Sequence, residues 1–215
     1  MVTQAIFSLV IILITLKSRK QWIIDPEEIT VMDNFFTPEC LKILKYRILY
    51  AKYWDTKYPG YYALDYFPQQ DYMSSLIANE LKMKLDLPEF IRAWSFVYDN
   101  NSNGVHLHCD PSIVNLNIWL TDTDCVKNFS KNGLLIYKLK PPSTWNRDEW
   151  NTYDSKSKKY TASKNIDPIK IEYKGNRAVF FNGAYFHSSD GVSMKDGVEN
   201  KRVSFTMLFG KQLEQ

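Results

Sequence analysis

The chain has 215 residues, a length that fits one domain better than two and needs no disulfide or metal to stabilise a core. Apolar residues make up 45% and aromatic residues 15% of it, which excludes disordered, collagen-like and low-complexity proteins. The formal net charge of +3 is too small to indicate nucleic-acid binding by itself. Three widely spaced cysteines, Cys40, Cys109 and Cys125, argue against a disulfide framework and fit a reducing compartment. We therefore expect a globular, cytoplasmic protein.

The first 20 residues form a hydrophobic segment that is open to two interpretations. Residues 5–16 are nearly all apolar, and a basic run at residues 17–20 follows them. A helix over residues 2–16 would be about 22 Å long, shorter than the roughly 30 Å core of a bilayer. A secretory signal would carry its basic residues before the apolar run. The segment is either a buried element or a weak membrane attachment through residues 2–16, and residues 21–215 are assigned to a single domain.

The first half of the chain predicts two helices and the second half a series of strands. Thr37 and Pro38 supply an N-cap and a first helical residue for a helix through about Ala51, and an apolar stripe marks a second helix from Gln70 to Leu85. Short β-branched and aromatic runs then follow, at residues 94–98, 113–120, 134–139, 169–173, 178–181 and 203–209. Helices followed by strands with no helix between them predict a mainly β, α+β fold. We expect a jelly-roll, cupin-like barrel with the helices packed on one side.

Residues 141–168 form a polar stretch with little periodicity, which predicts a long loop or lid. The surrounding segment from Lys138 to Lys174 holds nine basic and five acidic residues, hence a net charge of +4. Together with its Trp and Tyr residues, that charge would suit an acidic peptide, a nucleic acid or a sugar phosphate. The sequence leaves the choice open.

The chain has three histidines, and two of them fit a metal site. In His108-Cys109-Asp110, the alternation of side chains along a strand would put His108 and Asp110 on one side and Cys109 on the other. His187 follows later in the chain. Two imidazoles and one carboxylate make up the facial triad of non-haem Fe(II) oxygenases, which leaves coordination positions open for a co-substrate and dioxygen (O2). His108, Asp110 and His187 are therefore the predicted metal ligands and catalytic centre.

A basic strand near the C-terminus supplies a candidate carboxylate anchor. Alternation over residues 201–206 places Arg202, Ser204 and Thr206 on one face. An arginine can hold a carboxylate with two parallel hydrogen bonds, which would suit the distal end of 2-oxoglutarate. Arg177 is the second candidate, although strand alternation directs it poorly.

These residues together resemble the Fe(II)- and 2-oxoglutarate-dependent oxygenases, and more closely a prolyl-hydroxylase-like branch found in bacteria, phages and marine metagenomes. Besides the triad and the Arg-x-Ser pair, the resemblance includes Gly104, Asn115–Thr121, Asn176–Asn182 and Arg202–Gly210. It covers about residues 22–210. The branch's Gly-Gly is Asn-Gly here, and its Thr-Pro is Thr-Asp. The basic residue also lies 15 positions after His187, where prolyl hydroxylases commonly have about ten.

The resemblance implies a double-stranded β-helix fold and a dioxygenase that hydroxylates an unknown substrate, with release of succinate and CO2. Fe(II), 2-oxoglutarate and O2 are the implied cofactor and co-substrates, and analogy favours a protein or peptide substrate. Two alternatives stay open: a non-catalytic, cupin-like metal-binding module, and a metal-dependent isomerase on a similar barrel. Nucleic acid is not excluded as a partner.

Four further residues are weaker candidates for roles at this site. Tyr98 precedes the His-x-Asp motif and could hydrogen-bond the co-substrate. Asn115 and Asn117 share one face of a predicted strand, where their amides need partners, and Asn117 is the predicted co-substrate contact. His106 has the same parity as His108 and could reach the mouth of the site.

Overall fold

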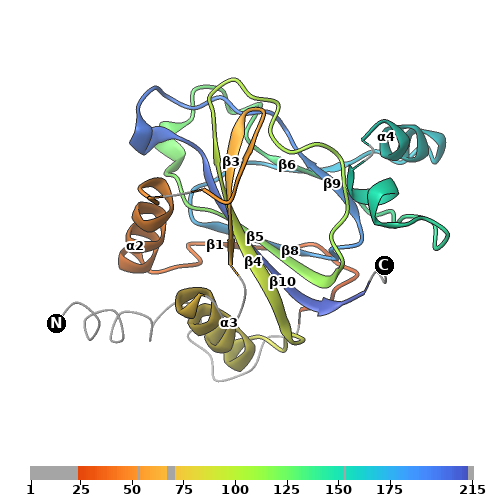
Figure 1. Cartoon of the computed structure of the whole chain (residues 1–215), viewed down its shortest axis with the longest axis horizontal. Helices are drawn as coiled ribbons and strands as arrows, with labels where there is room; N and C mark the ends of the chain where they lie inside the picture. Colours follow the sequence, from red (N-terminus) through yellow and green to blue (C-terminus); the bar gives the residue numbers. More distant parts are fainter. Residues whose placement is uncertain (1–23, 53, 67–70, 153, 213–215) are drawn as a thin grey trace.

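The computed structural model describes residues 24–52, 54–66, 71–152 and 154–212, which form two antiparallel sheets. The larger sheet has the order β1-β8-β5-β10-β4-β3-β2, and the smaller one β7-β6-β9 (Figure 1). The strands are β1 (Thr30–Asp33), β2 (Thr56–Tyr58), β3 (Tyr61–Tyr66), β4 (Phe90–Tyr98), β5 (Ser112–Trp119), β6 (Leu134–Tyr137), β7 (Ile169–Ile171), β8 (Arg177–Phe181), β9 (Phe186–Ser189) and β10 (Val203–Lys211). This is the predicted mainly β architecture.

Two helices cover one face of the larger sheet, as the sequence predicted (Figure 1). The first, α2, spans Pro38–Leu49, and the Thr37 side chain accepts a hydrogen bond from the Cys40 backbone N–H, as an N-cap should. The second, α3, spans Tyr72–Lys84 and is capped by Asp71 in the same way. Their buried residues share one apolar cluster with the outward-facing side of the larger sheet.

Strand β10 shows how the larger sheet divides its side chains between two environments. Val203, Phe205 and Met207 point toward the helices and join the apolar cluster there. Arg202, just before the strand, and Thr206 point the other way and line a cavity between the two sheets. Because strand side chains alternate, one strand serves both the core and the site.

The structure corrects the sequence interpretation of residues 141–168, which we call the insertion. We expected a loop, and we expected no helix between strands. The insertion instead contains a π-helical turn at Asp148–Thr152 and a helix, α4, at Asp154–Ser163. The buried residues of α4 are the small polar Ser157 and Thr161, so the sequence shows no apolar stripe that would mark a helix.

Several short elements were absent from the prediction. They are the strands β1, β2, β3 and β9, and the 3₁₀ helices Thr123–Cys125 and Val198–Asn200. Most are three or four residues long, which is too short for a recognisable period.

The hydrophobic segment at residues 1–20 lies outside the described residues, so neither interpretation of it is decided. Within the part of the chain that the structure describes, no helix has both the length and the apolar character needed to cross a membrane.

Candidate metal centre

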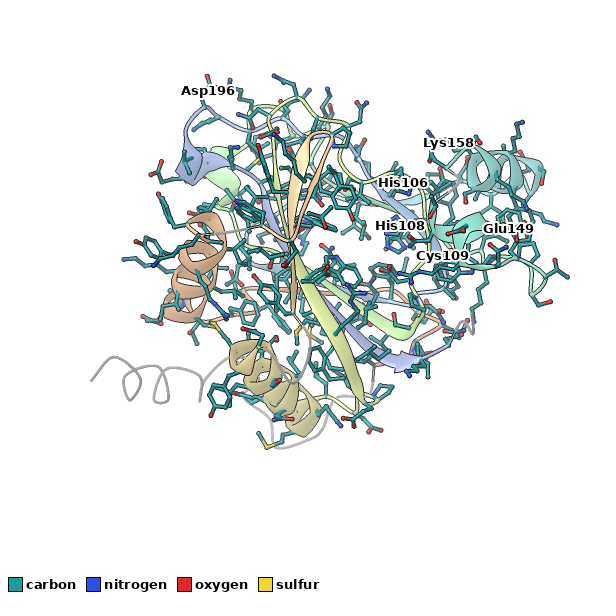
Figure 2. All side chains as sticks on the ribbon, in the orientation of Figure 1. His106, His108, Cys109, Glu149, Lys158 and Asp196 are labelled. Carbon is teal, nitrogen blue, oxygen red and sulfur yellow. The ribbon has the colours of Figure 1, made fainter. Side chains whose placement is uncertain are left out.

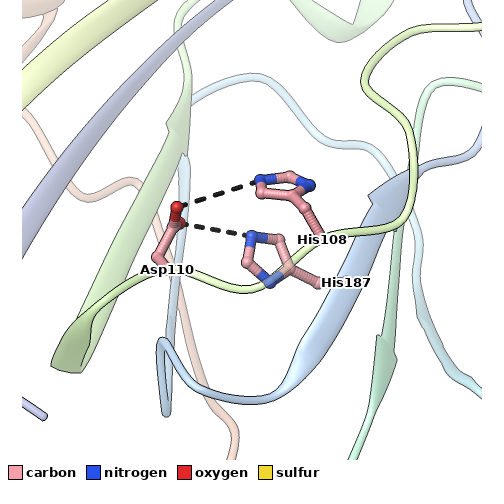
Figure 3. Close-up of side chains that lie close together, drawn as sticks. All are labelled: His108, Asp110 and His187. Atoms are coloured by element: carbon pink, nitrogen blue, oxygen red, sulfur yellow. Dashed lines mark ion pairs between the residues drawn. The ribbon is translucent and has the colours of Figure 1, made fainter. Parts of the chain in front are cut away.

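Three side chains that lie far apart in the sequence converge at one end of the cavity between the sheets (Figure 3). His108 and Asp110 come from the connection between β4 and β5, and His187 comes from β9. An Asp110 carboxylate oxygen lies 3.3 Å from His187 Nε2, and the other lies 3.9 Å from His108 Nε2. One ligand atom from each residue lies within 4.8 Å of the others.

Backbone pairing fixes this convergence. The His108 and His187 backbones exchange two hydrogen bonds, of 3.0 and 2.8 Å, so the segment before Asp110 runs beside β9 as an added edge strand. The Asp110 N–H donates to the Gly183 carbonyl at 2.7 Å. The three candidate ligands are therefore held by strand pairing rather than by a free loop.

Each histidine is oriented by the carbonyl group two residues before it. His108 Nδ1 lies 2.7 Å from the His106 carbonyl oxygen, and His187 Nδ1 lies 2.8 Å from that of Tyr185. A carbonyl oxygen only accepts, so each Nδ1 carries a proton and each Nε2 is the ring nitrogen that faces Asp110. Metal binding through Nε2 requires this orientation.

Asp110 is buried and is held by a neighbouring amide. Asn115 Nδ2 donates to an Asp110 carboxylate oxygen at 2.5 Å. Burial alone would raise the pKa of Asp110, but its hydrogen bond and charge interaction with His187 hold that pKa below the usual value. The group is thus an anion at neutral pH, as a metal ligand must be.

His108 stays neutral well into the acid range. Burial, followed by the neighbouring His187, lowers the pKa of His108 to about 4. At neutral pH its Nε2 lone pair is therefore free of a proton.

Cys109 points away from this centre, as strand alternation predicted. Its side chain is fully buried against Leu107, Trp150 and Phe186. Burial raises the pKa of the Cys109 thiol well above its usual value, so it is neither an available ligand nor a nucleophile.

The other end of the cavity is formed around Arg202, whose side chain is 1% exposed. Its guanidinium carbon lies 4.6 Å from the ring centre of Tyr98 and about 6 Å from those of Trp119 and Tyr173. Within the described part of the chain, the guanidinium makes one hydrogen bond, of 3.5 Å from Nη1 to the Gly191 carbonyl, and Nε has no partner. No acidic side chain among the described residues forms an ion pair with it.

Of the remaining predicted co-substrate residues, two line the same cavity, and the third, Ser204, contacts one of them. Tyr98 and Asn117 line the cavity, and the Ser204 hydroxyl lies 3.4 Å from the Tyr98 hydroxyl. Asn117 donates to the Thr206 hydroxyl at 3.0 Å, which leaves its buried carbonyl oxygen without a partner. Hydrogen-bonding groups are thus available between the triad and Arg202.

Two sequence candidates lie elsewhere. Arg177 is bound on the surface to both carboxylate oxygens of Asp33, at 2.6 and 3.1 Å, and does not line the cavity. His106 is exposed, and its Nε2 lies 2.7 Å from the Asn151 carbonyl oxygen in the insertion.

The sequence reasoning missed the aromatic residues that surround Arg202. Trp119 follows Asn115 and Asn117 at intervals of two on β5, so alternation alone could have placed it on the cavity face. Its buried Nε1 has no partner. Tyr173 follows β7, and no sequence pattern connects it with Arg202.

Solved structures share this fold at very low sequence identity. No protein-family model and no curated protein matches the sequence. HygX from Streptomyces hygroscopicus, with nickel, 2-oxoglutarate and hygromycin B bound, aligns with a TM-score of 0.55 and 9% identity over 84% of this chain and 82% of its own. The epimerase SnoN, in complex with Fe3+, α-ketoglutarate and nogalamycin RO, aligns with a TM-score of 0.59 and 10% identity over 86% of this chain and 80% of its own.

A prolyl hydroxylase from Trichoplax adhaerens, in complex with a hypoxia-inducible-factor peptide, aligns with a TM-score of 0.51 and 12% identity over 84% of this chain and 83% of its own. The chain therefore has the double-stranded β-helix fold of the 2-oxoglutarate-dependent oxygenases.

Proposed function

We propose that the protein is an Fe(II)- and 2-oxoglutarate-dependent dioxygenase. The observation that carries this proposal is the buried Arg202, which shares a cavity with a His-Asp-His cluster and has no carboxylate partner among the described residues. A buried charge without a counter-ion is strongly destabilising, so a bound anion is expected to complete the site.

The donor set at the other end fits a divalent iron ion. His108, Asp110 and His187 supply two neutral imidazoles and one carboxylate, the set that non-haem Fe(II) sites use. Ligand atoms at right angles around an ion roughly 2.1 Å away lie about 3 Å apart. The distances of 3.3 and 3.9 Å go to different oxygens of Asp110, and one ligand atom from each residue lies within 4.8 Å of the others, so the side chains would rotate inward to bind the ion.

The polar groups on the cavity wall match 2-oxoglutarate, which carries a carboxylate at each end. The cavity has room for about one water molecule, so its lining side chains would move apart to admit the co-substrate. Arg202 would bind the carboxylate distal to the metal with two hydrogen bonds, and Tyr98 and Ser204 would add hydroxyl contacts. Asn117, with the Thr206 hydroxyl beside it, would face the middle of the molecule.

Iron and 2-oxoglutarate together supply the oxidation of an unreactive C–H bond by O2, with release of succinate and CO2. The protein side chains would exclude water and hold the metal ligands in position. Trp94 and Phe96 on β4 line the cavity and limit the access of water, and Asn115 holds the Asp110 carboxylate in position. The fold thus orients the co-substrate and protects the reacting centre.

We further propose that the reaction is a hydroxylation and that the substrate is a protein or peptide side chain. The peptide bound to the Trichoplax adhaerens prolyl hydroxylase supports that substrate class. A metal-binding module would not turn over 2-oxoglutarate, and an isomerase that uses no 2-oxoglutarate would not need Arg202.

Succinate formation tests this function. Anaerobically loaded Fe(II) protein should form succinate from 2-oxoglutarate when O2 is admitted, slowly without substrate and faster with a peptide pool that contains a substrate. Asp110→Ala should abolish that formation, and Arg177→Ala should retain it. Absence of iron-dependent succinate from the wild-type protein under both conditions would contradict the assignment.

A further inference from the structure

The insertion does not cover the cavity as a lid would; it lies along the chain segment that carries the first metal ligand. In Figure 2, His106, His108 and Cys109 lie beside the part of the chain that carries Glu149 and Lys158. We propose that the insertion is a positioning element for the metal centre, acting through His106 on the orientation of His108. This rests on the proposed role of His108 as a metal ligand.

The insertion completes the backbone hydrogen bonding of that segment. On one side, the His108 backbone pairs with His187. On the opposite side, the N–H groups of Leu107 and Cys109 point away from β9 and would be an open sheet edge. Asp154 Oδ1 accepts from Leu107 at 3.1 Å, and the Trp150 carbonyl accepts from Cys109 at 3.0 Å.

Asn151 of the insertion makes two further hydrogen bonds to the same segment. Asn151 Nδ2 donates to the Cys109 carbonyl at 3.1 Å. The Asn151 carbonyl accepts from His106 Nε2 at 2.7 Å, and the His106 carbonyl in turn accepts from His108 Nδ1 at 2.7 Å. A continuous series of hydrogen bonds therefore runs from the insertion through His106 to the imidazole of His108.

Apolar packing fixes the insertion in this place. The Trp150 side chain is 1% exposed and packs with Leu107, Cys109 and Phe186. These residues lie on the back of the segment, on the side opposite Asp110. The insertion thus holds the segment from behind, while the front faces the cavity.

His187 has a different support. Its Nδ1 donates to the Tyr185 carbonyl, and the Tyr185 hydroxyl donates to a Glu27 carboxylate oxygen at 2.8 Å. None of these contacts involves the insertion. The insertion also packs on Phe186, the residue before His187, but the hydrogen bonds from Asp154 and Asn151 reach only the segment that carries His108. Loss of these hydrogen bonds should therefore disturb His108 and leave His187 in place.

The test uses Co(II) titrated into the metal-free full-length protein and followed by the ligand-field absorption of the ion. Asp154→Ala removes the acceptor of the Leu107 N–H and should weaken Co(II) affinity by about 10- to 100-fold, the usual effect of losing a group that orients a metal ligand. Its absorption spectrum should also change. Asp154→Asn keeps an acceptor oxygen and should restore most of the affinity and the wild-type spectrum.

Lys158→Ala is the matched control, because it removes the 2.6 Å ion pair to Asp154 Oδ2 and leaves the contact to Leu107. It should bind Co(II) as the wild-type protein does. His106→Ala, at an exposed position where folding should not suffer, should weaken affinity by about tenfold.

The outcomes separate the two proposals. A wild-type protein that binds no Co(II) would overturn the proposed function. A wild-type protein that binds it, with Asp154→Ala and His106→Ala matching Lys158→Ala in affinity and spectrum, would overturn the positioning role alone.

Discussion

The two ends of the cavity are both buried, but they differ in charge and in the elements that build them. At one end, Asp110 is an anion beside two histidines, carried by the smaller sheet and the segment paired with it. At the other, Arg202 is a cation enclosed by aromatic rings at the start of β10 in the larger sheet.

This difference indicates what each end would bind. The triad brings three metal-ligating side chains together, while the guanidinium has no acidic partner among the described residues. A metal ion would complete the first end and a carboxylate the second. A ligand that chelates the metal and carries a second carboxylate would bridge them, and its binding should therefore respond separately to changes at each end.

The largest expected effect is at the metal end. His108→Ala or His187→Ala should abolish Fe(II) binding, because each removes one of only three protein ligands. Metal content after anaerobic reconstitution and desalting measures this. Iron retention equal to wild type in both variants would refute the triad.

At the other end, Arg202→Ala should weaken 2-oxoglutarate binding by roughly 30-fold to a few thousandfold. Loss of one partner of a buried charge pair costs ~2–5 kcal/mol, and each 1.4 kcal/mol is about tenfold in affinity. Iron affinity should stay near wild type, since Arg202 is not a ligand. Calorimetric titration of 2-oxoglutarate into the anaerobic Fe(II) protein measures the first affinity, and titration of Fe(II) into the metal-free protein measures the second.

Two variants sharpen that result. Arg202→Lys should be intermediate, because it keeps the charge and loses the second parallel hydrogen bond. Arg177→Ala, which removes an ion pair with Asp33 and a hydrogen bond to the Glu172 carbonyl, both away from the cavity, should bind 2-oxoglutarate normally. Loss of binding in Arg177→Ala with retention in Arg202→Ala would mean that the wrong arginine has been assigned.

A smaller effect is expected on how the free energy of unfolding of the metal-free protein depends on pH. His108 has a pKa of about 4 in the folded state, against about 6.5 when unfolded, so between these values the unfolded state binds more protons. Its contribution to stability is complete above about pH 6.5 and is lost as the pH falls toward 4. Between pH 7 and pH 5 this should lower the free energy of unfolding by about 2 kcal/mol.

Urea unfolding at the two pH values measures that loss, and His108→Gln should reduce it by the same amount. The lowered pKa of Asp110 contributes only below about pH 4, outside this interval. An equal pH dependence in the wild-type and His108→Gln proteins would show that His108 is not held neutral by the fold.

The smallest effect is expected for Cys109, whose side chain lies on the side of residues 106–109 that faces away from the cavity. Cys109→Ala should cost about 1 kcal/mol of stability, because it leaves a small gap beside Trp150, and it should leave iron binding unchanged. The native thiol should also resist alkylation by iodoacetamide, since burial raises its pKa. Loss of iron in Cys109→Ala would mean that its side chain faces the site.

Helix capping, helical period and strand alternation can be recognised in the sequence, and they predicted the parts of the fold that follow them. Thr37 and the stripe behind it gave α2 because capping and helical period agree there, and alternation correctly placed Arg202 and Thr206 on one face. The insertion could not be predicted in this way, because Trp150 is the one large buried residue among those described there and the buried face of α4 is polar. Its helix depends on contacts with the segment at residues 106–109, which no local pattern reveals.

The candidate site shows the same division. His108, Asp110 and His187 could be selected because the chain has so few histidines and the His-x-Asp spacing is informative. The carbonyl groups that orient them, the rings around Arg202 and the position of Asn151 depend on strand pairing across distant parts of the chain. Such contacts require the tertiary structure.

The most direct test of the central claim is the addition of 2-oxoglutarate to anaerobic Fe(II) protein, followed by visible absorption. The account predicts a charge-transfer band from the chelate in the wild-type protein. The same band should appear in Arg202→Ala only at a much higher 2-oxoglutarate concentration, and no band should appear in His187→Ala. A wild-type protein that holds iron and develops no band at saturating 2-oxoglutarate would contradict the claim that the two ends bind one molecule.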